Sequence, residues 1–272
     1  MRIAVIGHAE HVTLGRAKTL PAAGDILHID DPAVIAGGGG GVAFFQLSRG
    51  DAELHFFTAL GRDDAAHEVH HQIAETKATI HAALRNAPHT RDLVIVTPGE
   101  RTIFVIGQPL QPQRDDRLSW DLLATCDAVY FTGEDPATIE TARAAKTLVV
   151  TARRAESLGR SGVRADVVLG SALDPREAAH LRDFAVPPRA VVMTEGAKGG
   201  TVETSSGTQR FAAAPPPKEI VGAYGAGDSF AGALTWYVAR GLSIVDACER
   251  ASHYGAAVLG GWNPLDHQLP LT

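Results

Sequence analysis

The chain has 272 residues, of which 45% are hydrophobic and 21% charged, and its formal net charge is -6. This composition is typical of a globular protein and excludes a disordered chain. The negative charge disfavours a nucleic-acid scaffold, because duplex binding relies on clustered Lys and Arg. No apolar run approaches the ~20 residues of a membrane-spanning helix. The cysteines, Cys126 and Cys248, lie far apart and indicate reduced thiols in a cytoplasmic protein.

The N-terminal third combines a buried strand, an irregular stretch and a glycine run. Residues 1–7 (MRIAVIG) predict the strand and are too short for a signal peptide. Residues 20–35 contain Pro21, Gly24 and Pro32 and are predicted to be non-helical. Glycines 37–41 lead into a helical pattern over residues 42–49 that ends at Gly50. Glycine at such a position permits close approach of the backbone to a ligand.

Residues 67–71 (HEVHH) match the His-Glu-x-x-His pattern of zinc proteases. On a helix, His67 and His71 share one face and provide two zinc ligands. The stretch follows Asp63 and Asp64 in a predicted solvated helix, and no third ligand is obvious downstream. We therefore interpret these residues as a chance match to the motif on a surface helix, with zinc-dependent hydrolysis as the minor alternative.

A hairpin is predicted where residues 93–96 and 102–106 flank Pro98 and Gly99, a pair suited to a tight turn. It has no helix between its strands, so we expect it to pair with the 20–35 stretch as a small β lid. The alternative is two surface loops without a joint function. The lid segments, about 9–36 and 90–107, are predicted to be inserted in a single domain covering residues 1–272. If the lid edge is exposed and apolar, Ile95, Phe104 and Ile106 pair two subunits in a homodimer.

The C-terminal half alternates short β-rich runs with helix-like stretches such as residues 136–145. Near-continuous apolar strands separated by helices predict a parallel sheet covered on both faces. The strand candidates are residues 128–131, 147–150, 166–169 and 190–194. Ligands of such sheets bind beyond the carboxyl ends of the strands, which directs attention to the loops after Gly133, Thr151, Gly170 and Thr194.

The most informative segment is Gly225-Ala226-Gly227-Asp228, followed by a helical pattern over residues 231–240 and a terminating Gly241. The glycines allow several N–H groups to converge at the helix start, and such a nest binds an anion. A carboxylate beside a bound anion repels it and would weaken simple anion binding. The carboxylate is useful there if it removes the proton from a hydroxyl that attacks a bound phosphoryl group. Asp228 is therefore a candidate general base. The alternative is a glycine-rich turn with Asp228 as an N-cap.

A third glycine motif is the Thr-x-Gly-x-x-Gly turn at residues 194–199, which follows a predicted strand. In order and spacing, the glycine run, this turn and the 225–228 segment resemble the ribokinase-like sugar kinases, the PfkB family. The resemblance covers nearly the whole chain, including residues 21–25, 59–64 and 101–103. A nicotinamide-dependent dehydrogenase is disfavoured, because no Gly-x-Gly-x-x-Gly follows the first strand.

The resemblance implies a three-layer α/β sandwich with a mostly parallel central sheet and a β lid. The lid closes on a sugar or nucleoside that receives phosphate from ATP with Mg2+. By position, Asp228 resembles the catalytic base, and its anion hole corresponds to Gly225, Ala226 and Gly227. The residues expected along the nucleotide are Thr194, Gly196, Gly199 and Gly200. Those expected at the phosphate acceptor are Glu10, Asp25, Gly38, Gly39 and Gly40.

In this family a loop after a central strand holds Asn and Glu three residues apart, near the magnesium and the phosphates. Asp174 is expected at the Glu position, where a hard oxygen ligand suits Mg2+ directly or through water. The alternative role for Asp174 is a helix N-cap before Pro175. Arg101 and Arg153 are candidates to assist with phosphate or acceptor charge, although surface ion pairing is the commoner fate of an Arg.

Departures from the family pattern concentrate at the acceptor. Gly222, Ala223 and Tyr224 stand where the family has Asp-Thr-Thr, which makes activation by a monovalent cation doubtful. An expected Asn after the glycine run is replaced by Gly41 or Val42. An expected acidic residue near the first strand is displaced, and Glu10 either takes over its task or is a solvated loop carboxylate.

The sequence therefore predicts an ATP-dependent kinase that phosphorylates a hydroxyl of a sugar or sugar-like molecule, nucleosides included. The alternative function is a catalytically weak or inactive sugar- or nucleotide-binding regulatory protein of the same fold. The retained Asp228 favours the enzyme.

Overall fold

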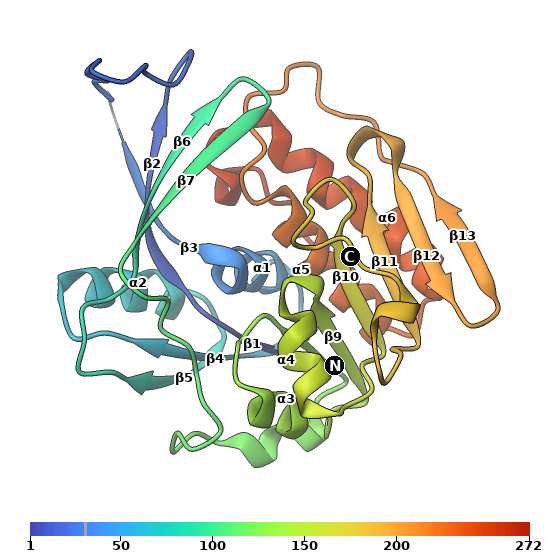
Figure 1. Ribbon diagram of the computed structural model, residues 1–272. Coiled ribbons are helices and arrows are strands. Elements are labelled where there is room, and N and C mark those ends of the chain that lie inside the picture. The colour runs from blue at the N-terminus through green and yellow to red at the C-terminus, as the bar shows by residue number, and fades with distance from the viewer. Residues whose placement is uncertain (30–31) are drawn as a thin grey trace.

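A computed structural model describes residues 1–29 and 32–272 (Figure 1). In this part of the chain a nine-stranded sheet has the order β13-β12-β11-β10-β9-β8-β1-β4-β5. Its parallel strands are β1 (Arg2–Ile6), β4 (Glu53–Leu60), β5 (Thr79–Leu84), β8 (Ala128–Phe131), β9 (Thr147–Thr151), β10 (Val167–Ser171) and β11 (Ala190–Thr194). At one edge β12 (Gly200–Thr204) and β13 (Gly207–Phe211) add an antiparallel hairpin.

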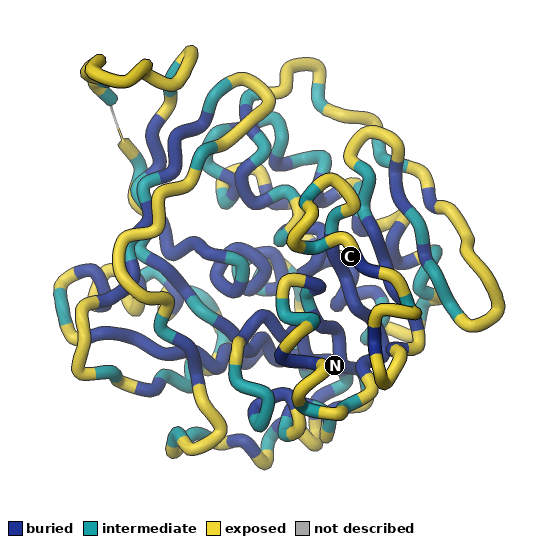
Figure 2. The backbone as a smooth tube through the Cα atoms, viewed as in Figure 1, coloured by how far each residue is buried: buried dark blue, intermediate teal, exposed yellow. Residues whose placement is uncertain are grey.

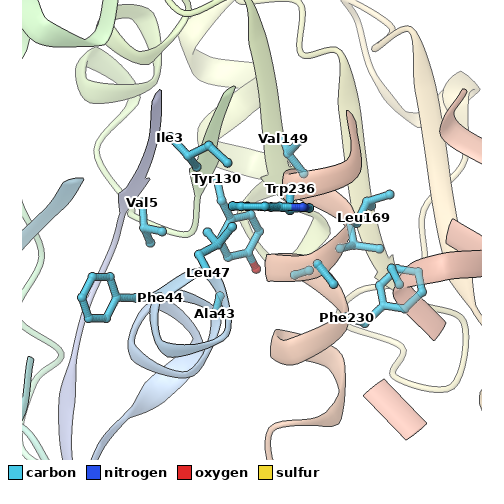
Figure 3. Packing of buried hydrophobic residues seen from close by; sticks show 14 of the residues in the cluster. Ile3, Val5, Ala43, Phe44, Leu47, Tyr130, Val149, Leu169, Phe230 and Trp236 are labelled. Atoms are coloured by element: carbon cyan, nitrogen blue, oxygen red, sulfur yellow. The ribbon is translucent and has the colours of Figure 1, made fainter. Parts of the chain in front are cut away.

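Helices cover both faces of this sheet. Because successive side chains of a strand point to opposite faces, Ile3 and Val5 pack on one side and Ala4 and Ile6 on the other. The first side is covered by α1 (Gly38–Ser48), α2 (Asp64–Ala74), α5 (Ala226–Ala239) and α6 (Ile244–Ala257). The second side is covered by α3 (Pro136–Ala142) and α4 (Ala155–Ser161). The predicted three-layer sandwich is confirmed, and Figure 3 shows its first core layer, where Phe44 and Trp236 lie between helices and sheet.

A second, smaller sheet has the order β3-β2-β6-β7 and lies beside the main sheet (Figure 1). It contains β2 (Glu10–Arg16), β3 (Ala33–Gly37), β6 (Arg91–Thr97) and β7 (Glu100–Ile106). The predicted hairpin is present as β6 and β7. Among the described residues of the 20–35 stretch, the last three belong to a strand, β3, whereas β2 was not singled out from the sequence. Residues 30–31, which the lid prediction includes, lie outside the described part.

The inner face of this sheet, called the lid here, packs against the main body. Val12 and Val96 from the lid contact a cluster that includes Val42 of α1 and the side chain of Tyr224. The outer edge is different, because β7 exposes Phe104 (52%) and Ile106 (58%) (Figure 2). Ile95 was expected at this exposed edge, and that expectation is wrong: its side chain lies in the lid interior at 3% exposure. The homodimer itself stays a prediction.

Two helices begin earlier than the sequence pattern suggests. α1 starts within the glycine run, at Gly38, and α5 starts at Ala226 rather than at residue 231. Glycine is a poor helix former, but close packing requires it here: a Cβ on Gly40 would lie 2.4 Å from the carbonyl oxygen of His8. Both glycine motifs are therefore first turns of helices. No helix in the described ranges is both long and apolar enough for a membrane span.

The strand order reverses between β1 and β8. From β1 the chain adds β4 and β5 on one side, and from β8 onward it adds strands on the other. Open α/β sheets bind ligands at such a switch point, beyond the carboxyl ends of the strands. Gly7 and His8 follow β1 there, and Thr132 follows β8.

Candidate functional site

The first turn of α5 forms an open cradle of backbone N–H groups. Gly225 precedes the helix with φ 77°, a left-handed conformation that favours glycine, and no N-cap side chain satisfies the first turn. A Cβ on Gly227 would meet no atom within 4 Å, so space is open beside this turn. Free N–H groups and the helix dipole together suit an anion.

Asp228 lies in this first turn and is partly exposed. Desolvation raises the pKa of its carboxyl group to about 7, and the charge of Glu177 pushes the pKa in the same direction. Arg153 and Arg101, the latter from lid strand β7, act in the opposite direction. A carboxylate with a pKa near neutrality is suited to accept a proton at physiological pH.

The first turn of α1 faces the same carboxylate. A Cβ on Gly39 would lie 3.2 Å from Asp228 Oδ1 and 3.5 Å from Thr132 Oγ1. The residue before α1, Gly37, also provides no capping side chain. Two helix N-termini thus meet at Asp228, next to the switch point of the sheet.

Glu10 is brought to this site by the lid. It begins β2, is only 6% exposed, and reaches the first turn of α1, where a Cβ on Gly38 (φ 75°) would lie 2.7 Å from Glu10 Oε2. The solvated-loop interpretation of Glu10 is therefore wrong. The charge of Asp228 helps to raise the pKa of Glu10, after burial as the main cause. His8 Nε2 lies 3.8 Å from Glu10 Oε1.

Tyr224 occupies the space between the lid and α1. Its buried hydroxyl accepts a hydrogen bond from Gly38 N at 3.2 Å, and its ring packs among the lid residues. A Cβ on Gly37 would lie 2.7 Å from the Tyr224 hydroxyl. An aromatic ring thus fills the space beside Gly37 and Gly38.

The carboxylate of Asp174 forms ion pairs with two arginines. Its carboxylate pairs with Arg153 at 2.9 Å and Arg176 at 3.2 Å, and the Arg176 hydrogen bonds hold its pKa well below the usual range. Its carboxylate accepts a hydrogen bond from Arg176 N at 3.0 Å, and its carbonyl oxygen accepts one from Ala178 N at 3.0 Å. Asp174 therefore caps a single helical turn, although no longer helix begins there. Its metal role stays a prediction.

Sequence reasoning missed Glu177, which binds Arg153 at 2.5 Å and acts on Asp228. Glu177 follows Asp174 by three residues, which is the spacing that the resemblance gives to its Asn and Glu. That spacing was the available signal, and it makes Glu177 a second candidate for the Glu position beside Asp174, which itself follows Ser171 by three residues. Among the residues described, no group of three or more His, Cys, Asp or Glu side chains is arranged to hold a metal ion.

Comparison with known proteins supports the resemblance. A model of the pfkB family carbohydrate kinases matches residues 168–263, the part that contains Asp174, Gly199 and Asp228. The resemblance to the PfkB family is confirmed. The match also confirms the predicted enzyme class, a phosphotransferase with an alcohol group as acceptor. A search of curated protein sequences gives no match.

Solved structures show the same ribokinase-like fold at low sequence identity. A putative ribokinase from Agrobacterium tumefaciens superposes with a TM-score of 0.82 at 19% identity, covering 99% of this chain and 94% of that one. Adenosine kinase from Sinorhizobium meliloti gives 0.77 at 17% identity, with 97% and 95% covered. Ribokinase from Arabidopsis thaliana, complexed with ribose and ATP, gives 0.74 at 15% identity, with 98% and 95% covered.

The turn that the PfkB resemblance assigns to the nucleotide has a packing role of its own. Thr194 ends β11, and its hydroxyl donates to the carbonyl oxygen of Gly170 at 3.2 Å. A Cβ on Gly199 (φ 82°) would lie 2.1 Å from Phe211 O, and one on Gly200 2.3 Å from Met193 O. Close packing against Phe211 of β13 and Met193 of β11 thus requires these glycines. Gly196, at φ 59°, opens the same turn, and the nucleotide role of the four residues stays a prediction.

Two other sequence features lie apart from Asp228. Asp25 is exposed and accepts a hydrogen bond from Ala22 N at 3.2 Å in its own turn; no hydrogen bond or ion pair of the described residues joins it to Glu10 or Asp228. His67 and His71 lie exposed on the surface of α2, as expected for a chance match to the zinc pattern.

Proposed function

We propose that this protein is an ATP-dependent kinase that transfers the γ-phosphate to a hydroxyl of a sugar or sugar-like molecule, nucleosides included, with Asp228 as general base. The observation that carries the proposal is the position of Asp228, with a pKa of about 7, where the N-termini of α1 and α5 meet. Support for the two substrates comes from the ribokinase of the same fold that holds ribose and ATP.

In the proposed reaction Asp228 accepts the proton of the acceptor hydroxyl while its oxygen attacks the γ-phosphorus. The new oxygen–phosphorus bond forms as the bond to the leaving ADP breaks. The N–H groups of Gly225, Ala226 and Gly227 donate to the oxygens of the moving phosphoryl group and stabilise its charge. The lid covers the acceptor and excludes water, which limits hydrolysis of ATP.

Positive charge for the phosphates comes from Arg153 and Arg101, both of which act electrostatically on Asp228. Mg2+ retains several waters and is held largely by substrate phosphates, so a site with few protein ligands suits it. Glu177 and Asp174, both paired with Arg153, are the carboxylates that would hold it, directly or through water. Bound Mg2+ would supply further positive charge. A monovalent cation remains doubtful, because the 222–224 segment has no carboxylate.

The nucleotide is proposed to lie along Thr194, Gly196, Gly199 and Gly200, and the acceptor beside Glu10, Gly38, Gly39 and Gly40. Asp25 belongs to this proposal only if the exposed 20–29 segment reaches the acceptor once substrate is bound. A cytoplasmic location, where ATP is available, accords with the same activity.

The deciding experiment replaces the base without changing its size. Asp228→Asn is expected to lower kcat at least ~100-fold while the ATP dissociation constant stays nearly unchanged, because the amide cannot accept the proton. The measurement is ADP release with a panel of alcohols, ATP and magnesium, together with calorimetric titration of ATP. Equal rates in the two proteins, or no transfer by the wild type, would favour the regulatory binder of the same fold.

A further inference from the structure

The lid carries a second buried acid beside Glu10. In the parallel pair β2–β6 the register aligns Val12 with Asp92, two residues after Glu10. Asp92 is 4% exposed. Every second residue of a strand shares one face, so Asp92 lies on the same inner face as Val94 and Val96. Its carboxyl group therefore lies on the side of the lid that covers the body.

Glu10 and Asp92 form a carboxyl pair. Burial, and after it the neighbouring carboxyl group of Glu10, raise the pKa of Asp92 to about 8. Near neutral pH the pair thus holds one proton between two carboxyl groups. His8 lies next to it and is kept neutral, since burial lowers its pKa to about 4.

Gln111 extends this cluster from the loop after the lid. Its side-chain nitrogen Nε2 lies 3.1 Å from His8 Nδ1, and the residue is 8% exposed. The buried oxygens Asp92 Oδ1 and Gln111 Oε1 receive no N–H or hydroxyl donor from the described residues. A proton held by Asp92 is donated towards Glu10, so Asp92 Oδ1 remains an acceptor, as Gln111 Oε1 does. Buried acceptors without donors are costly, so a donor from a ligand is expected.

The cluster of Glu10, Asp92, His8 and Gln111 lies near Asp228. The charge of Asp228 acts on Glu10, and the charges of Asp228, Glu10 and Asp92 all act on the Tyr224 hydroxyl. A molecule seated with one hydroxyl at Asp228 would therefore meet the carboxyl pair and the Gln111 oxygen with its remaining groups. These are oxygen acceptors, which hydroxyl groups satisfy.

We propose that Asp92 and Gln111, together with Glu10, bind the phosphate acceptor, and that this acceptor is an uncharged polyol with at least two hydroxyls besides the one phosphorylated. The proposal rests on the kinase function proposed above.

Charge disfavours a sugar phosphate or sugar acid. An anionic group would lie against Glu10 and Asp228. Arg154, the cation that acts on Glu10, already donates to Thr132 O at 3.1 Å and to Glu134 at 3.4 Å. An uncharged acceptor is not repelled by Glu10 and Asp228. It also does not need Arg154 as a counter-ion, so Arg154 keeps its present hydrogen bonds.

The test compares Gln111→Met and Asp92→Leu with Gln113→Met. Gln113 lies two residues further along the same loop and is exposed, so it is a matched control for Gln111. Gln111→Met and Asp92→Leu each remove an acceptor oxygen, so they are expected to raise the KM of the acceptor about tenfold or more, as for a lost buried hydrogen bond, and to leave the KM of ATP unchanged. Gln113→Met is expected to change neither constant.

The acceptor panel contains ribose, adenosine, ribose 5-phosphate, gluconate and glucosamine. Transfer to ribose or adenosine in preference to the other three supports the proposal, and preference for a phosphate, acid or amine overturns it. Thermal shifts with each compound report binding independently of turnover, and the stabilisation by the preferred acceptor is expected to vanish in the two site variants. If the wild type transfers phosphate but the variants keep its acceptor KM, only this inference fails. If it neither transfers phosphate to nor binds any of the five compounds, the kinase proposal fails with it.

Discussion

At Asp228, burial and the charge of Glu177 act together on one carboxyl group. Both raise its pKa, which reaches about 7, while Arg153 and Arg101 oppose them. A group with this pKa is half ionised near neutral pH, so its function as a base depends on pH within the physiological range.

The first prediction concerns this pH dependence. Because only the ionised carboxylate accepts a proton, kcat/KM is expected to fall about tenfold per pH unit below about 7 and to level off above it. The measurement is kcat/KM for the preferred acceptor from about pH 5.5 to 8.5. Glu177→Gln removes a negative charge and is expected to shift the midpoint to lower pH. A flat profile would show that Asp228 is not the base.

Gly227 offers a test of the anion cradle at the level of one side chain. A Cβ there meets no atom within 4 Å, so Gly227→Val is expected to fold with a Tm close to that of the wild type. Its side chain would cover the first-turn N–H groups, and kcat is expected to fall about 100-fold, as when an oxyanion donor is lost. Steady-state kinetics and thermal unfolding of the same sample check both parts. Wild-type turnover would contradict the placement of the phosphate.

At the scale of elements, the site depends on how closely α1 and α5 approach each other. Gly232 lies in the middle of α5, where a Cβ would lie 2.8 Å from the carbonyl oxygen of Ala43 in α1. The contact fixes the two helix N-termini relative to each other and thus fixes Gly39 beside Asp228. A glycine that lowers helix propensity is retained because it permits this contact.

Gly232→Ala is therefore expected to destabilise the protein by about 1–3 kcal/mol, as overpacking does, and to lower kcat/KM. The control is Gly159→Ala in α4, where a Cβ meets no atom within 4 Å. That substitution is expected to stabilise by about 0.5–1 kcal/mol through helix propensity. Urea unfolding measures both changes. An increase in stability in Gly232→Ala would mean that the two helices separate at little cost.

At the scale of the whole molecule, the edge strand β7 of the lid carries apolar side chains in solvent. Phe104 and Ile106 lie on this strand, which has a partner strand on one side only. Exposed apolar edges tend to pair with another chain. The predicted homodimer is consistent with this edge, although Ile95 is not part of it.

Phe104→Lys combined with Ile106→Lys is expected to shift the protein towards monomer, because two charges would be buried at the edge. Analytical ultracentrifugation over a range of concentrations measures the association. Ile26→Lys is the control, since Ile26 is 82% exposed in the segment between β2 and β3. A wild-type protein that is monomeric at every concentration would refute the dimer.

The sequence alone was sufficient for the features that depend on local chemistry. The 225–228 nest and the glycine run were recognisable because only glycine allows the left-handed turn before α5 and the close approach of α1. The core strands of the parallel sheet were recognisable because they are short and almost wholly apolar. Strands β4 and β5 and the β12–β13 hairpin were not singled out.

Only the tertiary structure decided which polar groups meet. Gly38 and Tyr224 are 186 residues apart in sequence, yet one donates its N–H to the hydroxyl of the other. The burial of Glu10, its pairing with Asp92 and the contact of Glu177 with Arg153 likewise depend on the packing of separate segments. No local pattern encodes such contacts, because a side chain acquires its solvation and its neighbours only when distant strands and helices come together.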